Sequence, residues 1–291
     1  MKAIGVEIGG GHIAAAVIDT GTGAVDGFES AAHAGKDVGA IVEVLGRMVA
    51  ARGEMRVGIG LAAQLARDAS GDVSVRVAPS LGWRDFAFDA AVAARIGRKP
   101  RTVNDLSAVA FGEWRFGAGR GTVGPFYCVY IGSGIGSALI VDGAVYDGAS
   151  GVAGELGHTK VKPGGEPCGC GQRGCLEAYV GGLALARLSQ GKTASQIEAA
   201  AGRGESWAVP IWGAVCRELP IALANVVAIL NPATLCVGGG VIDHTERLFD
   251  TCAAGVRAFA PSVATASLAI AKSELGARAG VIGAACLAAS K

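Results

Sequence analysis

A glycine-centred segment that occurs twice constrains the fold of this chain most strongly. The sequence VEIGGGHIAAAVID (6–19) aligns without a gap on VYIGSGIGSALIVD (129–142), with Val, Ile, two Gly and the closing Asp at matched positions. Each copy predicts a strand, a glycine turn and a second strand. Two such copies, roughly 120 residues apart, indicate a duplicated domain in which each half opens with a glycine-tipped hairpin.

Strand and helix patterns alternate along the rest of the chain, which predicts an α/β protein. Strand patterns cover 3–8, 13–18, 24–28, 56–61, 101–105, 126–132, 138–148 (a hairpin that turns at Asp142-Gly143), 234–240 and 267–273. Helix patterns cover 37–52, 86–96, the stretch from Asp105 to about Trp114, much of the chain after Leu176, and 278–289.

Composition excludes several classes of protein. Of the 291 residues 51% are apolar and 18% charged, so a large core is expected, and the net charge of +1 comes with basic residues scattered singly. That pattern argues against nucleic acid or an anionic membrane as a partner. The start, MKAIGVEIGG, enters a strand without the features of a signal peptide, and apolar runs such as 221–230 fall short of the ~20 residues that span a bilayer. We therefore expect a soluble, cytoplasmic protein with reduced thiols.

Three glycine clusters are candidate nucleotide contacts. Glycine lets consecutive backbone N–H groups converge on a phosphate; the alternative is that each cluster only makes a tight turn. Neither hairpin tip is followed by the Lys of a P-loop or by the helix of a dinucleotide fold. The candidate phosphate cradles are Gly9, Gly10 and Gly11 in the first hairpin and Gly132, Ser133, Gly134 and Gly136 in the second; the candidate nucleoside platform is Gly238, Gly239 and Gly240, after a buried strand.

Asn104 and Asp105 stand where a strand pattern gives way to a helix pattern. One interpretation makes either of them the N-cap of that helix. The other makes Asp105 the base that removes a proton from an attacking hydroxyl, with Asn104 holding a neighbouring hydroxyl. The sequence leaves both interpretations open.

A cysteine cluster predicts a zinc site. Cys168, Cys170 and Cys175 follow C-x-C-x4-C spacing with glycines between them, and His158 lies upstream. Cys3His is a closed structural zinc site, so the metal is not expected to carry the chemistry; a redox pair or incidental thiols are the alternatives. The other cysteines lie singly in apolar stretches and are expected to be small buried hydrophobes.

Two carboxylates flank the predicted zinc ligands. Glu155 lies three residues before His158, and Glu177 lies two residues after Cys175. Carboxylates held on one rigid loop would accept hydrogen bonds from several hydroxyls, which suits a polyol. His158 can bind a metal through one ring nitrogen and donate through the other.

Taken together, these motifs resemble the ROK family of sugar kinases and sugar-responsive repressors, over essentially the whole chain. The most specific element is G-E-L-G-H followed by C-G-C-G-x-x-G-C-L-E, here 154–158 and 168–177. IGSGIGSALIVDG, the Asn104-Asp105 pair and VGGGV occur in the family's order. The resemblance implies a duplicated actin-like (ribonuclease H-like, hexokinase) fold with a cleft between two domains. We expect a small N-terminal domain at 1–105, a larger one at 106–277, and a final helix at about 278–291 that packs back onto the first. The larger domain carries the segment with the predicted zinc ligands, 154–182, which we call the zinc loop.

The resemblance also implies roles for individual residues. Asp105 is the catalytic base, the first two glycine clusters with His12 hold ATP phosphates, and the third faces the nucleoside. Zinc is structural, magnesium accompanies ATP near Glu7, and the family forms dimers or tetramers, so a homodimer or homotetramer is expected. Sugar hydroxyls are contacted by Asn104, Asp105, Glu155, His158 and Glu177, and positions 64 and 80 lie on the substrate side.

This chain departs from the family pattern at three places. The first hairpin usually contains Asp-Ile-Gly-Gly-Thr-Lys, and here it is Glu7-Ile8-Gly9-Gly10-Gly11-His12. A Gly-x-Pro-Gly turn is replaced by Leu61-Ala62-Ala63-Gln64, and an Asn that contacts sugar is replaced by Ser80. The last two changes predict altered substrate choice, because a site built to bond a hydroxyl can reject an analogue that lacks it by ~10⁴-fold.

These observations favour ATP-dependent phosphorylation of a hydroxyl, the primary exocyclic one, on a hexose or hexose-like substrate. Candidates are glucose, an amino sugar such as kanosamine, and a C7 cyclitol. Loss of the Thr hydroxyl at Gly11 leaves a second candidate, a catalytically weak or silent sugar-binding protein. A sugar-sensing regulator is least favoured, because family repressors carry an N-terminal helix-turn-helix domain and this chain begins at the phosphate hairpin.

Overall fold

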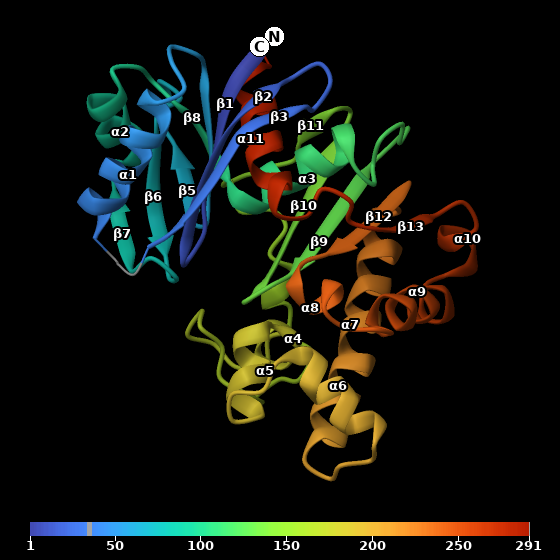
Figure 1. The fold of residues 1–291 in the computed structure, drawn as a ribbon. Coiled ribbons are helices and arrows are strands. Elements are labelled where there is room, and N and C mark those ends of the chain that lie inside the picture. The colour runs from blue at the N-terminus through green and yellow to red at the C-terminus, as the bar shows by residue number, and fades with distance from the viewer. Residues whose placement is uncertain (34–36, 291) are drawn as a thin grey trace. The chain divides into compact units, whose positions relative to one another are not determined.

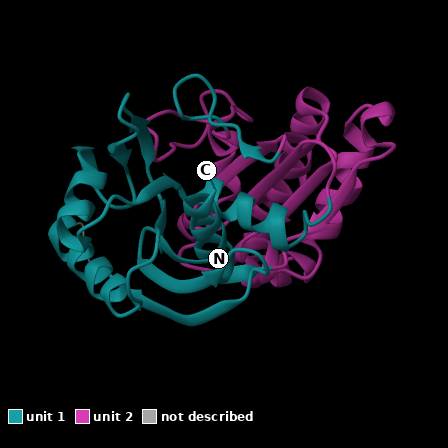
Figure 2. Cartoon of the chain, turned by 90° about the horizontal axis from the view of Figure 1, so that it is seen from above, with its two compact units in different colours: residues 1–121, 143–153, 275–291 teal, residues 122–142, 154–274 magenta. Residues whose placement is uncertain are grey.

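The computed structural model describes residues 1–33 and 37–290 of the chain (Figure 1). Lys291, the last residue of the predicted final helix, lies outside the described residues. By their internal contacts the residues form two compact units (Figure 2). Unit 1 comprises 1–121, 143–153 and 275–291, and unit 2 comprises 122–142 and 154–274. Each unit is built on its own sheet.

The main sheet of unit 1 has the strand order β3-β2-β1-β4-β8. β1 pairs antiparallel with β2, and β1, β4 and β8 run parallel, so three strands end at the same edge. The strands are β1 (Lys2–Ile8), β2 (His12–Asp19), β3 (Val25–Ala32), β4 (Val57–Leu61) and β8 (Arg101–Asn104). The helices are α1 (Val38–Ala50), α2 (Phe88–Ile96), α3 (Asp105–Phe116) and α11 (Ala279–Ala289), with the short helical turn η2 (Gly276–Arg278) and the short strand β11 (Ala144–Val145).

Helix α11 lies against the sheet at backbone contact. A side chain at Gly5 of β1 or at Gly58 of β4 would meet backbone atoms of α11, and one at Gly283 of α11 would meet the backbone of α3. Ten of the eleven α11 residues are buried. Glycine at these crossing points lets the last helix pack directly within unit 1.

A second sheet in unit 1 follows β4 and was not predicted from the sequence. It contains β5 (Gln64–Arg67), β6 (Val73–Ala78) and β7 (Trp83–Phe86) in antiparallel pairing. Its inner residues Val75, Ala78 and Trp83 belong to the same core cluster as α1 and α2. The predicted helix at 86–96 is confirmed as α2, beginning two residues later.

The sheet of unit 2 repeats the arrangement. β9 (Phe126–Ile131) pairs antiparallel with β10 (Ile135–Val141), and β9 runs parallel to β12 (Thr234–Gly238), which runs parallel to β13 (Ala269–Lys272). A hairpin followed by parallel strands is thus present in both units, which confirms the α/β fold with duplicated sheets. The turn after β10 has positive φ at both Asp142 and Gly143, as the Asp-Gly pair predicts.

Helices form most of the rest of unit 2. They are η1 (Leu156–His158), α4 (Glu177–Val180), α5 (Gly182–Leu188), α6 (Ala194–Gly202), α7 (Ala208–Leu230), α8 (Gly240–Asp243), α9 (Leu248–Phe259) and α10 (Ser262–Thr265). The core joins the sheet to α6, α7 and α9.

Helix α7 is longer than the apolar run 221–230 that the sequence suggested. It has 23 residues and is long and apolar enough, by length and composition, to cross a membrane. Its residues Trp212, Val215, Leu219 and Leu223 are buried in the unit 2 core. The burial of this face is that of a core helix in a folded domain.

The boundaries of the units differ from the domain limits expected from the sequence. Helix α3 (Asp105–Phe116) groups with unit 1, which first ends at Gly121 rather than at residue 105. The segment 143–153 also groups with unit 1, and the final segment of unit 1 begins at Leu275. The reason for the α3 assignment is its packing against α11.

Candidate functional site

Three predicted site segments of unit 1 follow directly on neighbouring parallel strands. Ile8 pairs with Leu61, and Leu61 pairs with Asn104. The glycine turn, the Ala62–Gln64 segment and Asp105 therefore leave one edge of the sheet side by side. Ligand sites of α/β sheets occur at this carboxyl edge.

Asn104 supplies the N-cap of α3. Its side-chain oxygen accepts from the backbone N–H groups of Leu106 (2.9 Å) and Ser107 (3.3 Å). Its amide nitrogen donates to the carbonyl of Ala63 at 3.2 Å. The alternative that the sequence left open, Asn104 or Asp105 as cap, is thereby resolved in favour of Asn104.

Asp105 begins α3 and is half-buried. Burial, with a smaller contribution from the negative charge of Glu7, raises the pKa of the Asp105 carboxyl to about 7. A carboxyl with this pKa is poised to accept a proton near neutral pH, as a general base must.

Glu7 lies between the first glycine turn and α11. Its carboxylate occupies the space that a side chain at Gly280, in the first turn of α11, would need, where a helix N-terminus favours negative charge. His12 Nε2 lies 3.8 Å from Glu7 Oε1, and the His12 ring covers Gly9. The hydrogen bond and charge of Glu7 raise the pKa of His12 despite its partial burial.

The remaining predicted residues of unit 1 lie around the same turn. Apart from its chain neighbours, no described atom lies within 4 Å of the position that a Cβ at Gly11 would take, so the tip is open there. Ser80 packs against Gly10, with its Cβ 2.8 Å from where a Gly10 side chain would begin. Gln64 starts β5 at a β-bulge and is half-buried. Sequence spacing gave no signal for the contact between Ser80 and Gly10.

Unit 2 brings its two glycine clusters together. β9 and β12 are parallel neighbours with Tyr130 opposite Gly238, so the Gly132–Gly134 turn and the Gly238–Gly240 turn leave the same sheet edge. Gly239 has φ 93°, and a side chain there would meet the backbone of Ile131 at 2.7 Å. Two glycine turns this close together suit a ligand that has phosphates at one end and a planar ring at the other.

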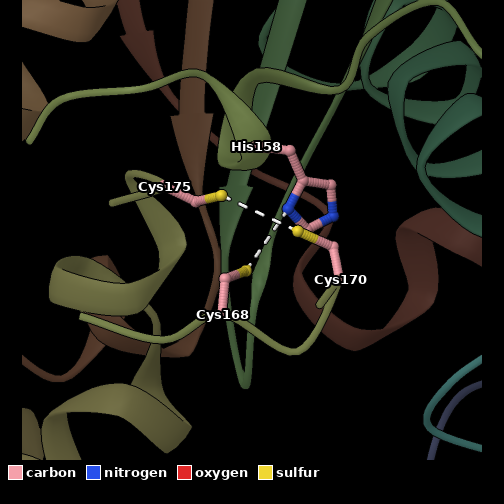
Figure 3. Close-up of side chains that lie close together, drawn as sticks. All are labelled: His158, Cys168, Cys170 and Cys175. Atoms are coloured by element: carbon pink, nitrogen blue, oxygen red, sulfur yellow. Dashed lines mark hydrogen bonds between the residues drawn. The ribbon is translucent and has the colours of Figure 1, made fainter. Parts of the chain in front are cut away.

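The four predicted zinc ligands converge (Figure 3). Their ligand atoms all lie within 4.8 Å of one another, with Cys170 Sγ 3.7 Å from Cys175 Sγ and Cys168 Sγ 3.6 Å from His158 Nδ1. Tetrahedral zinc with bonds of about 2.3 Å to S and 2.0 Å to N requires S···S and S···N separations of about 3.8 and 3.6 Å. The side chains present therefore fit a four-coordinate zinc ion.

One side of His158 faces the predicted metal site, and its other side faces a carboxylate. His158 turns Nδ1 toward the cysteines, while its Nε2 lies 3.6 Å from Glu155 Oε2. Lys160, which the sequence analysis did not single out, donates from Nζ to Cys175 Sγ at 2.8 Å. A cation at this position would balance the negative charge of three thiolates if the site bound one Zn²⁺.

Glu177 makes a contact that its sequence position alone did not predict. Its Oε2 accepts from the backbone N–H of Ile135 at 2.8 Å, directly after the second glycine turn. Its Oε1 lies 3.9 Å from Cys168 Sγ. Glu177 thus joins the zinc loop to the glycine hairpin, a contact that spans 42 residues of sequence and that spacing could not reveal.

The same residues also fit the other expected cofactors, ATP and magnesium. The open tip at Gly11 and the paired glycine turns of unit 2 suit a nucleotide's phosphates and its ring. Magnesium in phosphoryl-transfer sites is held by one or two carboxylates plus phosphate oxygens. Glu7 and Asp105 are the carboxylates that the unit 1 edge offers.

Comparison with known proteins agrees with this geometry. The sequence model of the ROK family matches residues 3–291. The glucokinase of Streptomyces coelicolor is 30% identical over 323 aligned positions, which cover 98% of this chain and 96% of that enzyme. A ROK family glucokinase from Streptomyces griseus, solved in complex with glucose and AMPPNP, matches with a TM-score of 0.81 at 31% identity, covering 99% of both chains.

A regulatory protein shares the fold as well. The ROK family transcriptional regulator that is a homologue of E. coli MLC matches with a TM-score of 0.79 at 26% identity. The match covers 99% of this chain and 78% of the regulator. The fold is therefore common to proteins with different functions, and the function depends on the residues of the site.

Proposed function

This chain belongs to the ROK family, and from that premise we propose that it is a kinase that transfers the γ-phosphoryl group of ATP to a hydroxyl of a hexose-like sugar. The similarity to ROK glucokinases over nearly the whole chain supports a sugar kinase. The observation that carries the proposal is Asp105, a half-buried carboxyl with a pKa of about 7 beside the first glycine turn.

In the proposed mechanism Asp105 accepts the proton of the attacking hydroxyl as that oxygen bonds to phosphorus. The bond from phosphorus to the leaving oxygen of ADP breaks, and Asp105 later releases its proton to solvent. Because phosphoryl transfer needs mainly positioning and charge neutralisation, one well-placed carboxylate suffices. Asn104 fixes the first turn of α3 and hence the position of this carboxylate.

We assign the nucleotide to the glycine turns. Gly9, Gly10 and Gly11 with His12 would contact phosphates in unit 1. The turn of Gly132, Ser133 and Gly134 would do so in unit 2, beside Gly238, Gly239 and Gly240 for the nucleoside. Magnesium, carried by ATP near Glu7, would neutralise phosphate charge. Exposed His12, with its raised pKa, supplies positive charge where the family's Lys is absent.

We assign the sugar to a set of hydroxyl-binding side chains. Asn104, Asp105, Glu155, His158 and Glu177 would hold it. His158 is suited to this because Nδ1 faces the zinc ligands and Nε2 is turned toward Glu155. Zinc would fix Glu155, His158 and Glu177 and carry none of the chemistry, since the four protein ligands complete its coordination.

Gln64 and Ser80 are proposed to set the choice of sugar. Ser80 replaces an Asn that contacts sugar in the family, and Gln64 ends a segment that replaces a turn beside the sugar. Ser80 also packs on Gly10 of the first turn. An amino sugar such as kanosamine or a C7 cyclitol is proposed beside glucose, with transfer to the primary exocyclic hydroxyl.

The test is an ADP-release assay over glucose, mannose, glucosamine, N-acetylated hexosamines, 3-amino-glucose and C7 cyclitols. One substrate is expected to exceed the others clearly in kcat/KM, and Gln64→Gly with Ser80→Asn is expected to shift that ranking by about tenfold or more. An unchanged ranking in the double variant contradicts the specificity assignment. If the protein binds a sugar but releases no ADP with any of the sugars tested, the result would favour the catalytically silent alternative that Gly11 suggests.

We further propose a cytoplasmic homodimer or homotetramer. The burial of α7 in the unit 2 core supports a soluble enzyme. Ile229, Phe259 and Val263, on α7, α9 and α10 of unit 2, are exposed apolar side chains that support self-association. Light scattering during size exclusion gives the mass, and a strictly monomeric protein at micromolar concentration contradicts this assignment.

A further inference from the structure

Three hydrogen bonds join the end of the zinc loop to the second glycine turn within unit 2. Ile135 N donates to Glu177 Oε2 at 2.8 Å. Gly182 N donates to the carbonyl of Gly132 at 2.8 Å, and Leu183 N donates to the carbonyl of Ser133 at 2.9 Å. Gly132, Ser133 and Ile135 are therefore each hydrogen-bonded to a residue within 177–183, and Gly134 lies between two of them.

Glycine makes this approach possible from both sides. A side chain at Gly134 would collide with the carboxylate of Glu177, and one at Gly182 would lie 2.8 Å from the carbonyl oxygen of Gly132. The Glu177 carboxylate thus covers Gly134, and its bond to Ile135 N is charge-assisted, which makes it the strongest of the three.

The same segment is tied to the predicted zinc ligands. Cys175 is fully buried, two residues before Glu177, and its Sγ lies 3.7 Å from Cys170 Sγ. Leu176 N donates to the carbonyl of Thr159 at 2.9 Å, next to the β-bridge between Lys160 and Cys175. Fixing Cys175 therefore fixes the start of α4, where Glu177 is the first residue.

From these contacts we propose that the zinc loop orders the second phosphate-binding turn, with Glu177 as the positioning residue that transmits this order. Zinc bound by the cysteines and His158 holds the backbone at 175–177, and Glu177 holds the turn at 132–135 in the shape that receives phosphate. The consequence is that zinc supports nucleotide binding even when no sugar is present. The claim that zinc supports nucleotide binding rests on the proposed kinase function. The claim that the zinc loop orders the turn at 132–135 does not depend on that function.

Two readouts separate the inference from the proposed function. Hydrogen exchange of the peptide covering 132–136 reports the order of the turn without any ligand. Titration with ATP in the absence of sugar reports nucleotide binding. We expect Glu177→Ala, and wild-type protein stripped by a chelator, to exchange about tenfold faster in this peptide and to bind ATP about tenfold more weakly, with recovery when zinc is returned to the stripped wild type.

A matched control is Glu166→Gln, which alters another carboxylate of the same loop whose partner is Arg187 at 2.8 Å; exchange at 132–136 is expected to stay as in the wild type. Unchanged exchange after zinc removal overturns the inference, even in a protein that binds ATP. Faster exchange in a protein whose wild type binds no ATP supports the coupling and contradicts the proposed kinase. The chelator arm needs no substitution, so it decides the question even where Glu177→Ala does not fold.

Discussion

Asp105 combines two features that a structural carboxylate at a helix start does not need. Its neighbour Asn104 already caps α3, and burial together with Glu7 holds the pKa of the Asp105 carboxyl at about 7. A carboxylate in such surroundings lowers the stability of the fold. Carboxylates with strongly raised pKa values are therefore found mainly at functional sites. Because Asn104 supplies the cap, replacing Asp105 tests its role as a base without removing the helix cap.

We predict that Asp105→Asn lowers kcat by about 10²–10⁴-fold, because the amide cannot accept the proton. Sugar affinity is expected to change little, since the amide keeps the shape and polarity of the carboxyl. Steady-state ADP release and direct sugar titration measure the two quantities. The control is Asp89→Asn, at a buried carboxylate that accepts from Thr102 and Val73 and lies outside the predicted site. Equal losses of kcat and sugar affinity in Asp105→Asn would point to a structural role.

The raised pKa of Asp105 gives the acid limb of the pH profile. The base works only when deprotonated, so kcat/KM is expected to fall tenfold per pH unit below about pH 7. Since the negative charge of Glu7 contributes to the raised pKa, Glu7→Gln is expected to move the limb to lower pH, whatever it does to the maximal rate. Initial rates from pH 5 to 9 for both proteins test this. A limb that stays in place in Glu7→Gln contradicts the electrostatic link.

At the scale of single residues, the sequence predicted the cluster of three cysteines and His158 but not the partners of other candidate site residues. The motif spacing picked out Cys168, Cys170, Cys175 and His158, and the structure brings their ligand atoms together. It could not choose between Asn104 and Asp105 as cap, because both side chains cap helices and the choice depends on backbone direction. The contacts of Glu177 with Ile135 and of Ser80 with Gly10 join distant segments, which no local pattern encodes.

The zinc loop is the element in which local sequence and tertiary structure agree most fully. Glycines at 171 and 174 adopt positive φ between the cysteines, so the chain can return each thiol to one point. Backbone bridges join Lys160 to Cys175 and Pro167 to Arg173. Backbone hydrogen bonds such as Cys168 N to Gln172 O (2.8 Å) and Gly174 N to Glu166 O (2.8 Å) shape the loop further. We infer that a metal bound by the four converging side chains adds to this order.

We therefore predict about one zinc per chain and its loss in Cys170→Ser, which removes one of four ligands. Elemental analysis of the purified protein measures the metal, and a thermal scan is expected to show a lower Tm for the variant. The matched control is Cys216→Ser on α7, a half-buried thiol outside the cluster, which should keep its zinc. A wild-type protein without zinc, or a Cys170→Ser protein that retains it, contradicts the assignment.

The most buried strands were predicted well, whereas the three strands of the second sheet in unit 1 were not predicted. β1, β4, β9 and β12 are apolar runs with nearly every residue buried, and each was expected within one or two residues. β5, β6 and β7 have four to six residues and carry Arg and Asp on exposed positions. Their pairing with one another stabilises them, and that information is tertiary rather than local.

At the scale of the whole molecule, the duplication seen in two 14-residue segments extends to the sheets of both units. In each, the first strand of a glycine-tipped hairpin pairs with a parallel strand, and that strand pairs with another parallel strand. The repeated sheet was predictable because the hairpin sequence recurs. The limits of the units were not, because α3 and α11 join unit 1 through glycine contacts between residues far apart in sequence, such as Gly112 with Ala279.

Glu113 of α3 is hydrogen-bonded to two segments that lie next to points where the chain passes from one unit to the other. It is fully buried; Oε2 accepts from Ala118 N at 3.1 Å and Oε1 accepts from Leu275 N at 2.9 Å. Ala118 precedes the point where the chain first leaves unit 1, and Leu275 is where it returns for the last time. Both bonds lie within unit 1, so this side chain fastens the ends of two connections to the helix that begins with Asp105.

We predict that Glu113→Ala lowers the free energy of unfolding by about 3 kcal/mol, because it removes a fully buried, charged acceptor from two part-buried N–H groups. Proteolysis should speed up at 117–121 and 274–278, the two segments that Glu113 holds. The control, Glu43→Ala on α1, removes an exposed carboxylate that pairs with Arg95 at 2.9 Å and should cost no more than about 0.5 kcal/mol. Denaturant unfolding and limited proteolysis of both variants measure the difference. If Glu113→Ala unfolds like the control, the carboxylate does not hold these connections, and their order must come from the packing of α3 against α11 alone.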